Sequence, residues 1–237
     1  AGLTELCREL VECESPTDDA QAVGRFVELV ADRLSGLGRV RTLPGGRYGP
    51  HLQCEFDLPG HDKDGRIMCL GHSDTVWPVG TLKTMPFRDD GVCLHGPGVL
   101  DMKAGIAMLI FAARALCDLG VKVRRNVVLQ LNSDEETGSE SSRALTEETA
   151  RGSNAVLVLE PAEGLEGKLK TARKGIGDYV VTVRGRAAHS GLNFSAGASA
   201  IVELAKQIEV IAGFSDTARG ITVNPGLISG GSRVNVV

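Results

Sequence analysis

The chain has 237 residues, with 26 Lys and Arg against 30 Asp and Glu, and a formal net charge of -4. Its hydrophobic fraction of 42% is typical of a globular protein, and its length suits one large or two modest domains. A weakly acidic chain with 4% aromatic residues lacks the basic surface and stacking rings that nucleic-acid binding requires. No apolar run approaches the ~18 to 20 residues of a membrane span. We therefore expect neither nucleic acid nor a membrane as a partner.

The cysteines favour a reducing environment. They are scattered without a CxxC pair, mostly inside apolar runs where a thiol behaves as a small apolar side chain, at Cys7, Cys13, Cys54, Cys69, Cys93 and Cys117. Because disulfide frameworks belong to oxidising compartments, we expect a cytoplasmic location.

The first predicted elements indicate an α/β layered fold. After a short helical start, residues 18–37 carry apolar side chains at helical spacing, and they end in a turn with Gly36 and Gly38. Residues 102–120 form a helix that is apolar nearly all round, so it must be buried against a sheet. Short apolar runs predict strands at residues 52–56, 66–72, 126–133 and 155–160. Strands that alternate with helices predict a mainly parallel sheet sandwiched by helices.

The pattern changes near residue 174. Residues 177–185 alternate apolar and polar side chains, which is typical of a sheet with one solvated face. An amphipathic helix at residues 196–211 and a strand-like run at residues 220–230 follow, and the last residues also read as a strand. We therefore expect one domain over residues 1–174 and a second, smaller α+β domain over residues 175–237, with its last strand incomplete.

Acidic and histidine side chains gather where the predicted strands end. Open α/β sheets bind their ligands at this edge, so we expect these side chains to converge. They come from four segments. The first carries His72 and Asp74, the second is a glycine-rich turn with Asp101, the third carries Asp134, Glu135 and Glu136, and the fourth carries Glu160.

A metal ion explains this cluster chemically, because crowded carboxylates repel one another unless a cation neutralises them. Mixed nitrogen and oxygen ligands favour Zn²⁺, with Mn²⁺ or Co²⁺ as alternatives. Asp74 can accept the second ring N–H of His72 and so fix its tautomer. Of the neighbours Glu135 and Glu136, one can bind metal while the other deprotonates a water molecule.

The same residues also have simpler explanations. Asp101 can cap the helix that follows it, and an adjacent acidic pair is commonly solvated. The remaining histidines His51, His61 and His95 lie in polar or loop segments, where we expect surface or packing roles. The residues alone leave both interpretations open.

Five motifs occur in the order GHSDTVWPVGTL (71–82), HGPGVLDMKAGIAMLI (95–110), SDEETGS (133–139), LEPAEG (159–164) and GRAAHSG (185–191). Together they resemble the two-metal amidohydrolase and peptidase superfamily of glutamate carboxypeptidase, aminoacylase and the acetylornithine and succinyl-diaminopimelate deacylases. The resemblance implies a zinc-peptidase-like catalytic domain followed by a lid and dimerisation domain.

The resemblance also implies a ligand set for two Zn²⁺ ions. His72 and Glu160 would bind one ion, Glu136 would bind the other, and Asp101 would bridge both. The bond between Asp101 and Met102 would be cis, a rare geometry for a residue other than proline. A further histidine ligand would follow Val237, so we expect the chain to be part of a longer protein with the second metal site incomplete.

Further roles follow from the same resemblance. Glu135 would be the general base, and Asp74 would orient His72. His189 matches a lid histidine that reaches the active site of a neighbouring subunit and stabilises the oxyanion. Asn235 resembles a lid asparagine near the substrate.

These roles imply a hydrolase that cleaves an amide bond and forms a homodimer through its lid. The motifs at residues 71–82 and 171–191 look closest to the glutamate carboxypeptidase branch. We therefore expect release of a C-terminal amino acid, such as glutamate, from a small peptide or N-acyl conjugate. The alternatives are a deacylase of N-acyl amino acids and a non-catalytic member that binds ligand or dimerises.

Overall fold

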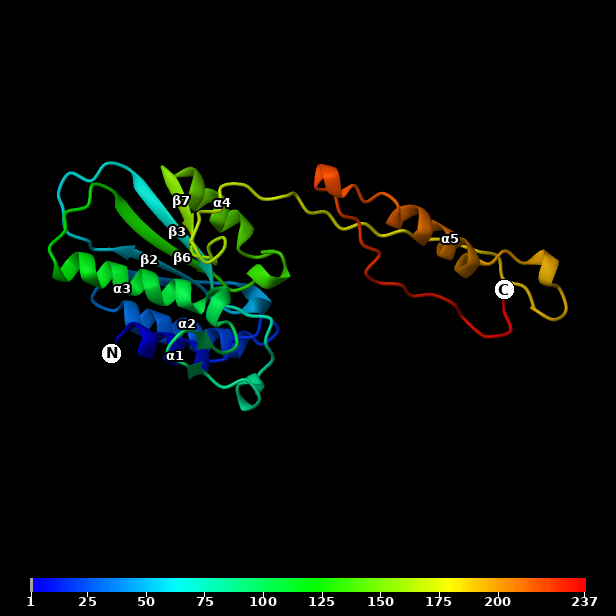
Figure 1. Ribbon diagram of the computed structural model, residues 1–237, viewed down its shortest axis with the longest axis horizontal. Coiled ribbons are helices and arrows are strands. Elements are labelled where there is room, and N and C mark those ends of the chain that lie inside the picture. The colour runs from blue at the N-terminus through cyan, green and yellow to red at the C-terminus, as the bar shows by residue number, and fades with distance from the viewer. Residues whose placement is uncertain (1) are drawn as a thin grey trace. The chain divides into compact units, whose positions relative to one another are not determined.

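The computed structural model describes residues 2–237, and the chain divides into two compact units, Ala1–Lys168 and Leu169–Val237 (Figure 1). The first unit contains a sheet, several helices and a small two-stranded hairpin. Its helices are α1 (Leu3–Glu12), α2 (Ala20–Leu34), α3 (Ala104–Asp118) and α4 (Arg143–Arg151). Its strands are β1 (Gly38–Leu43), β2 (His51–Phe56), β3 (Arg66–His72), β4 (Arg88–Asp89), β5 (Leu94–His95), β6 (Asn126–Asn132) and β7 (Ala155–Val158).

The main sheet has five strands in the order β1-β2-β6-β3-β7. Strands β6, β3 and β7 run parallel to one another, whereas β2 pairs antiparallel with both β6 and β1. The expected α/β fold is therefore confirmed, with an antiparallel pair added at one side. Because β3 lies between β6 and β7, the carboxyl ends of three strands meet at one edge of the sheet.

The two faces of the sheet differ in chemistry. On β2, Leu52 and Cys54 point into the apolar core that α1, α2 and α3 cover (Figure 1). Alternate residues point the other way, so Gln53 faces α4, where its amide donates to Thr149 Oγ1 at 3.2 Å. The same amide donates to Gln130 Oε1 at 2.8 Å. An apolar layer therefore stabilises one face, and a hydrogen-bonded layer joins α4 to the other.

The two long helices that the sequence predicts are present and slightly shorter. Helix α2 begins after Asp19, whose carboxylate accepts from the backbone N–H groups of Gln21 and Ala22. It ends at Leu34, because Gly36 takes a left-handed conformation with φ of +79°. Helix α3 lies within the predicted range of residues 102–120.

The second unit is built around helix α5 (Ala200–Ala212), which Ser199 caps by accepting from the N–H of Val202 at 3.3 Å. The strands predicted at residues 177–185 and 220–230 are wrong, because neither run forms a strand in the described chain. Alternation specifies which side chains share a face, but a strand also requires a pairing partner. Within residues 2–237 no strand pairs with residues 177–185, and Tyr179 and Val180 are each 92% exposed.

None of the helices in residues 2–237 combines the length and the apolar character needed to cross a membrane.

Candidate metal centre

Strand register brings the predicted ligands to one level. His72, the last residue of β3, pairs with Asn132 at the end of β6. On the other side of β3, Leu70 pairs with Val158 of β7. His72 follows Leu70 by two residues and Glu160 follows Val158 by two, so the two side chains lie side by side. Parallel pairing therefore delivers the imidazole, the turn after β6 and Glu160 to the same edge.

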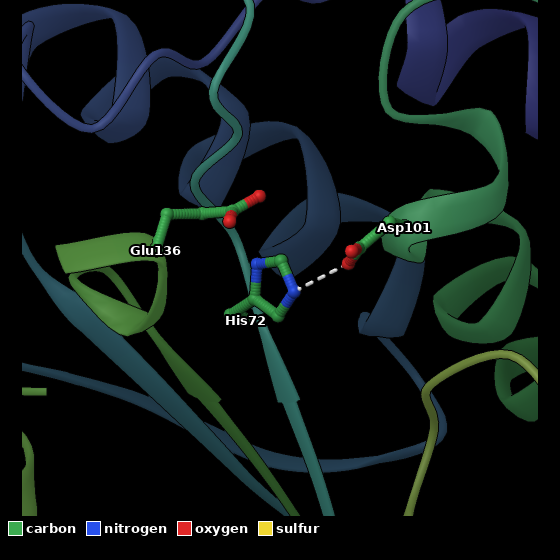
Figure 2. Close-up of side chains that lie close together, drawn as sticks. All are labelled: His72, Asp101 and Glu136. Carbon is green, nitrogen blue, oxygen red and sulfur yellow. Dashed lines mark hydrogen bonds and ion pairs between the residues drawn. The ribbon is translucent and has the colours of Figure 1, made fainter. Parts of the chain in front are cut away.

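His72 is at the middle of the cluster, with a side chain only 1% exposed. Its Nδ1 lies 2.9 Å from the backbone oxygen of Asp74, and because a carbonyl oxygen only accepts, Nδ1 carries a hydrogen. Its Nε2 faces carboxylates, with Asp101 Oδ1 at 2.9 Å and Glu160 Oε1 at 3.3 Å. Figure 2 shows the ring between Asp101 and Glu136, with its Nε2 directed at Asp101. Nε2 is thus the atom that can bind a metal ion.

Asp101 lies in the segment Val99–Lys103 that leads into α3, where its own backbone is not helical, with φ of -120° and ψ of 96°. The Asp101–Met102 peptide bond is cis, as the resemblance implied. The helix-capping alternative for Asp101 fails, since α3 begins at Ala104 and Lys103 occupies its N-cap. The Asp101 carboxylate instead lies against His72, with Oδ1 2.9 Å from Nε2.

Asp74 connects His72 to the turn after β6. That 3₁₀ turn, Glu135–Thr137, directs the backbone N–H groups of Glu135 and Glu136 at the Asp74 carboxylate, at 3.2 Å each. The Asp74 carboxylate Oδ1 lies 3.5 Å from His72 Nδ1, whereas the backbone oxygen of Asp74 lies 2.9 Å from the same nitrogen. Asp74 therefore orients the imidazole through its main chain and the glutamate turn through its side chain.

Asp134 and His51 hold the residues on either side of this turn in place. Both side chains are buried, and the Asp134 carboxylate accepts from the backbone and hydroxyl of Ser141, at 2.6 and 2.8 Å. His51 Nδ1 accepts from the N–H of Ser133 at 3.1 Å, which agrees with the packing role expected for it.

Two groups of potential ligands share His72. One joins His72 with Asp101 and Glu136, the other joins it with Glu135 and Glu160, and within each group the ligand atoms lie within 4.8 Å of one another. A single buried imidazole surrounded by carboxylates suits a divalent ion such as Zn²⁺. Which carboxylate serves which ion, and Glu135 as the base, stay predictions.

Electrostatics also favour a cation in this place. Burial alone would lower the pKa of His72, but hydrogen bonds and charge from Asp74 and Glu160 raise it to about 11. Desolvation raises the pKa of Glu135, and Glu160 adds to this effect. The pKa of Glu136 is raised by desolvation and by Asp101. Desolvation is the first cause of both glutamate pKa shifts, and the nearby carboxylates add to it. A divalent ion would relieve this repulsion between carboxylates.

A cavity of about 220 Å³ lies beside this cluster. Its wall includes His72, Glu135 and Glu160 together with Arg143 and Thr146 of α4. Space for part of a substrate therefore adjoins the ligand groups.

His189 and Asn235 lie in the second unit, close to each other. The N–H of Ser190 donates to the backbone oxygen of Asn235 at 3.1 Å, and His189 Nδ1 accepts from the N–H of Gly191 at 3.1 Å. Their functional roles stay predictions.

Thr17 also belongs to this site, although no motif includes it. Its hydroxyl donates to Asp74 Oδ2 at 2.7 Å across 57 positions of sequence. A lone threonine between two helices carries no sequence signal for such a contact.

Comparison with known proteins agrees with this geometry. Residues 68–225 match the profile of Peptidase family M20/M25/M40. Carboxypeptidase G2 of Pseudomonas sp. (strain RS-16) is 30% identical over 97% of this chain and 55% of its own length. Succinyl-diaminopimelate desuccinylase of Gluconacetobacter diazotrophicus is 36% identical over 55% of this chain and 34% of its own length. A tripeptidase structure from Staphylococcus aureus aligns with a TM-score of 0.70 at 19% identity, covering 99% of this chain and 62% of that one.

The chain therefore belongs to Peptidase family M20/M25/M40. It spans about half the length of the carboxypeptidase that it matches along nearly its whole sequence.

Proposed function

We propose that this member of Peptidase family M20/M25/M40 is a metal-dependent hydrolase of amide bonds. The observation that carries the proposal is the buried imidazole of His72, whose Nε2 faces Asp101 and Glu160 at the carboxyl edge of the sheet. Zn²⁺ is the proposed metal, two ions in a complete active site, with Co²⁺ or Mn²⁺ as substitutes. The residues that would hold it are His72, Asp101, Glu136 and Glu160.

Bound zinc would polarise the amide carbonyl and lower the pKa of a water molecule. Glu135 accepts the proton that this water loses as it attacks the carbonyl carbon. Glu135 then returns the proton to the leaving nitrogen, so the amine departs neutral and the base is regenerated. The place of Glu135 supports this role, because its carboxylate lies with His72 and Glu160 in one group whose ligand atoms are within 4.8 Å of one another.

Residues of both units complete the proposal. Asp74 positions His72 and the glutamate turn, and His189 stabilises the oxyanion in the active site of a neighbouring subunit. Asn235 contacts the substrate. The assembly is a homodimer formed through the second unit, in a reducing cytoplasm where the buried thiols of Cys54 and Cys69 persist.

The proposed substrate is a small peptide or N-acyl conjugate from which a C-terminal amino acid, such as glutamate, is released. The likeness to carboxypeptidase G2 over 97% of the chain supports this choice. The likeness to a desuccinylase supports a second candidate, the deacylation of N-acyl amino acids.

A paired substrate assay tests the proposal. The zinc-loaded protein is incubated with dipeptides that end in glutamate and with N-acetyl and N-succinyl amino acids, and the released amine is measured. A carboxypeptidase cleaves the peptides, a deacylase cleaves only the acyl compounds, and Glu135→Gln abolishes most of either activity. A protein that binds zinc but cleaves neither set is the non-catalytic binding or dimerisation module instead.

A further inference from the structure

The connection between α1 and α2 touches the metal centre, although it precedes the part of the chain that matches the family profile. Residues 13–17 of this connection run beside the segment that follows β3. Pro16 and Thr75 form a parallel bridge, Thr75 donates its N–H to Ser15 O at 2.8 Å, and Thr17 donates its N–H to Thr75 O at 3.1 Å. The backbone pairing fixes the connection directly against Asp74.

Thr17 uses this position to contact the Asp74 carboxylate. Its hydroxyl lies 2.7 Å from Oδ2, which is shorter than the 3.2 Å contacts from the N–H groups of Glu135 and Glu136. Both partners are buried, Thr17 at 7% exposure and Asp74 at 1%. Water cannot readily replace a hydroxyl in such a place, so Thr17 is a third fixed donor to the carboxylate, beside the two backbone N–H groups.

The same connection also holds the segment that carries Asp101. The ammonium group of Lys103 is buried and donates to the backbone oxygen of Cys13 at 2.7 Å. Two sides of the ligand cluster, one at Asp74 and one just after Asp101, are therefore fastened to residues 13–17.

We propose that Thr17 is a positioning residue of the metal centre, which acts by fixing the Asp74 carboxylate. Asp74 in turn sets the imidazole of His72 through its backbone oxygen and the Glu135–Thr137 turn through its side chain. The inference rests on the proposed metal centre and adds to it a residue outside the five motifs.

The test compares the zinc affinities of Thr17→Ser and Thr17→Ala, measured by competition with a chromophoric chelator. Both variants lack the methyl group of threonine, and they differ from each other only by the hydroxyl group. The difference between their zinc affinities therefore reports on the hydroxyl alone. Thr17→Ser stays within about threefold of the wild type, whereas Thr17→Ala binds zinc about 10-fold more weakly, the lower end of the range for partners behind a metal ligand. Circular dichroism of the metal-free proteins shows whether each variant folds.

Thr149 provides the matched control. It is equally buried, at 7% exposure, and its hydroxyl donates to Leu145 O and accepts from Gln53 Nε2, neither of which belongs to the ligand groups. Thr149→Ser and Thr149→Ala should bind zinc with equal affinity. If the loss of any buried hydroxyl weakened zinc binding by destabilising the fold, Thr149→Ala would also bind zinc more weakly.

A double-variant cycle identifies the route of the effect. If Thr17 acts through Asp74, Thr17→Ala has no further effect on zinc affinity once Asp74→Ala has removed the carboxylate. Equal zinc affinities for Thr17→Ser and Thr17→Ala, or an undiminished effect in the Asp74→Ala background, would overturn the inference. A wild-type chain that takes up no zinc would overturn the metal centre itself, and the role of Thr17 with it.

Discussion

His72 organises the centre because its two ring nitrogens meet different groups. Nδ1 donates to a main-chain oxygen, which does not titrate, whereas Nε2 faces the carboxylates of Asp101 and Glu160. The first contact fixes the ring, and the second leaves one nitrogen for a cation. In the absence of metal, a proton on Nε2 satisfies the same carboxylates.

This exchange of a proton for a metal predicts a pH dependence. The pKa of His72 is raised to about 11, so the ring is protonated throughout the neutral range and must lose a proton when zinc binds. The apparent zinc affinity should rise about 10-fold for each pH unit between about pH 6 and about pH 9. Chelator competition at several pH values, corrected for the chelator's own protonation, measures the slope. A flat profile would show that His72 binds zinc without releasing a proton, against this account.

Helix α3 lies tightly against the segment that carries Glu160. An added Cβ at Gly105 would collide with the backbone oxygen of Leu159, and a backbone atom cannot move aside as a side chain can. The glycine thus permits the approach of α3 to the residue just before Glu160, at the end of β7 (Ala155–Val158).

We expect Gly105→Ala to lower the free energy of unfolding by about 1–3 kcal/mol, the cost typical of overpacking, and to weaken zinc binding. Gly24→Ala is the matched control in α2, since its Cβ would meet only Pro50 Cδ, at 3.9 Å. That change should stabilise the chain by up to about 1 kcal/mol, because alanine favours a helix interior. Urea unfolding measures both variants. Equal stability of the two variants would mean that α3 can shift at no cost.

Some elements could be predicted from the sequence, and others could not. The apolar runs at residues 66–72 and 155–160 predict two strands, and both form, parallel to each other. Burial follows only for β3, because all four residues of β7 (Ala155–Val158), at the edge of the sheet, are exposed. Strand β1 (Gly38–Leu43) was not predicted, because Val40 is the one apolar side chain between the charged Arg39 and Arg41. It forms because each of its residues pairs with β2. Residues 177–185 are the opposite case, a clear alternation without a partner strand.

The same distinction holds for the site. His72 and Glu160 end predicted strands and Glu136 follows one, so parallel topology was enough to gather these three. Asp101 was placed only by its position before a predicted helix. Thr17 joins the site only through a contact across 57 residues, and Lys103, although two residues from Asp101, contacts Cys13 across 90 residues. Such contacts depend on how α1 and α2 pack, which periodicity does not reveal.

At the scale of the assembly, the proposed dimer predicts complementation between inactive subunits. His189→Ala should lower kcat and kcat/KM together by about 10²- to 10³-fold with zinc content intact, as expected of a group that acts on the oxyanion. Mixing His189→Ala with Glu135→Gln subunits should restore part of the activity, since some sites then combine an intact base with an intact histidine. Mixed dimers that recover no activity would confine His189 to its own subunit or to a structural role.

The zinc content of two variants tests the central claim most directly. Purified wild type, Asp101→Ala and Glu135→Gln are loaded with zinc and dialysed, and the metal per chain is measured by mass spectrometry. If Asp101 bridges the ions and Glu135 is the base, Asp101→Ala loses most of its zinc. Glu135→Gln keeps the wild-type content while its rate falls by about 10²- to 10⁴-fold. Equal zinc loss in both variants would contradict this division of roles.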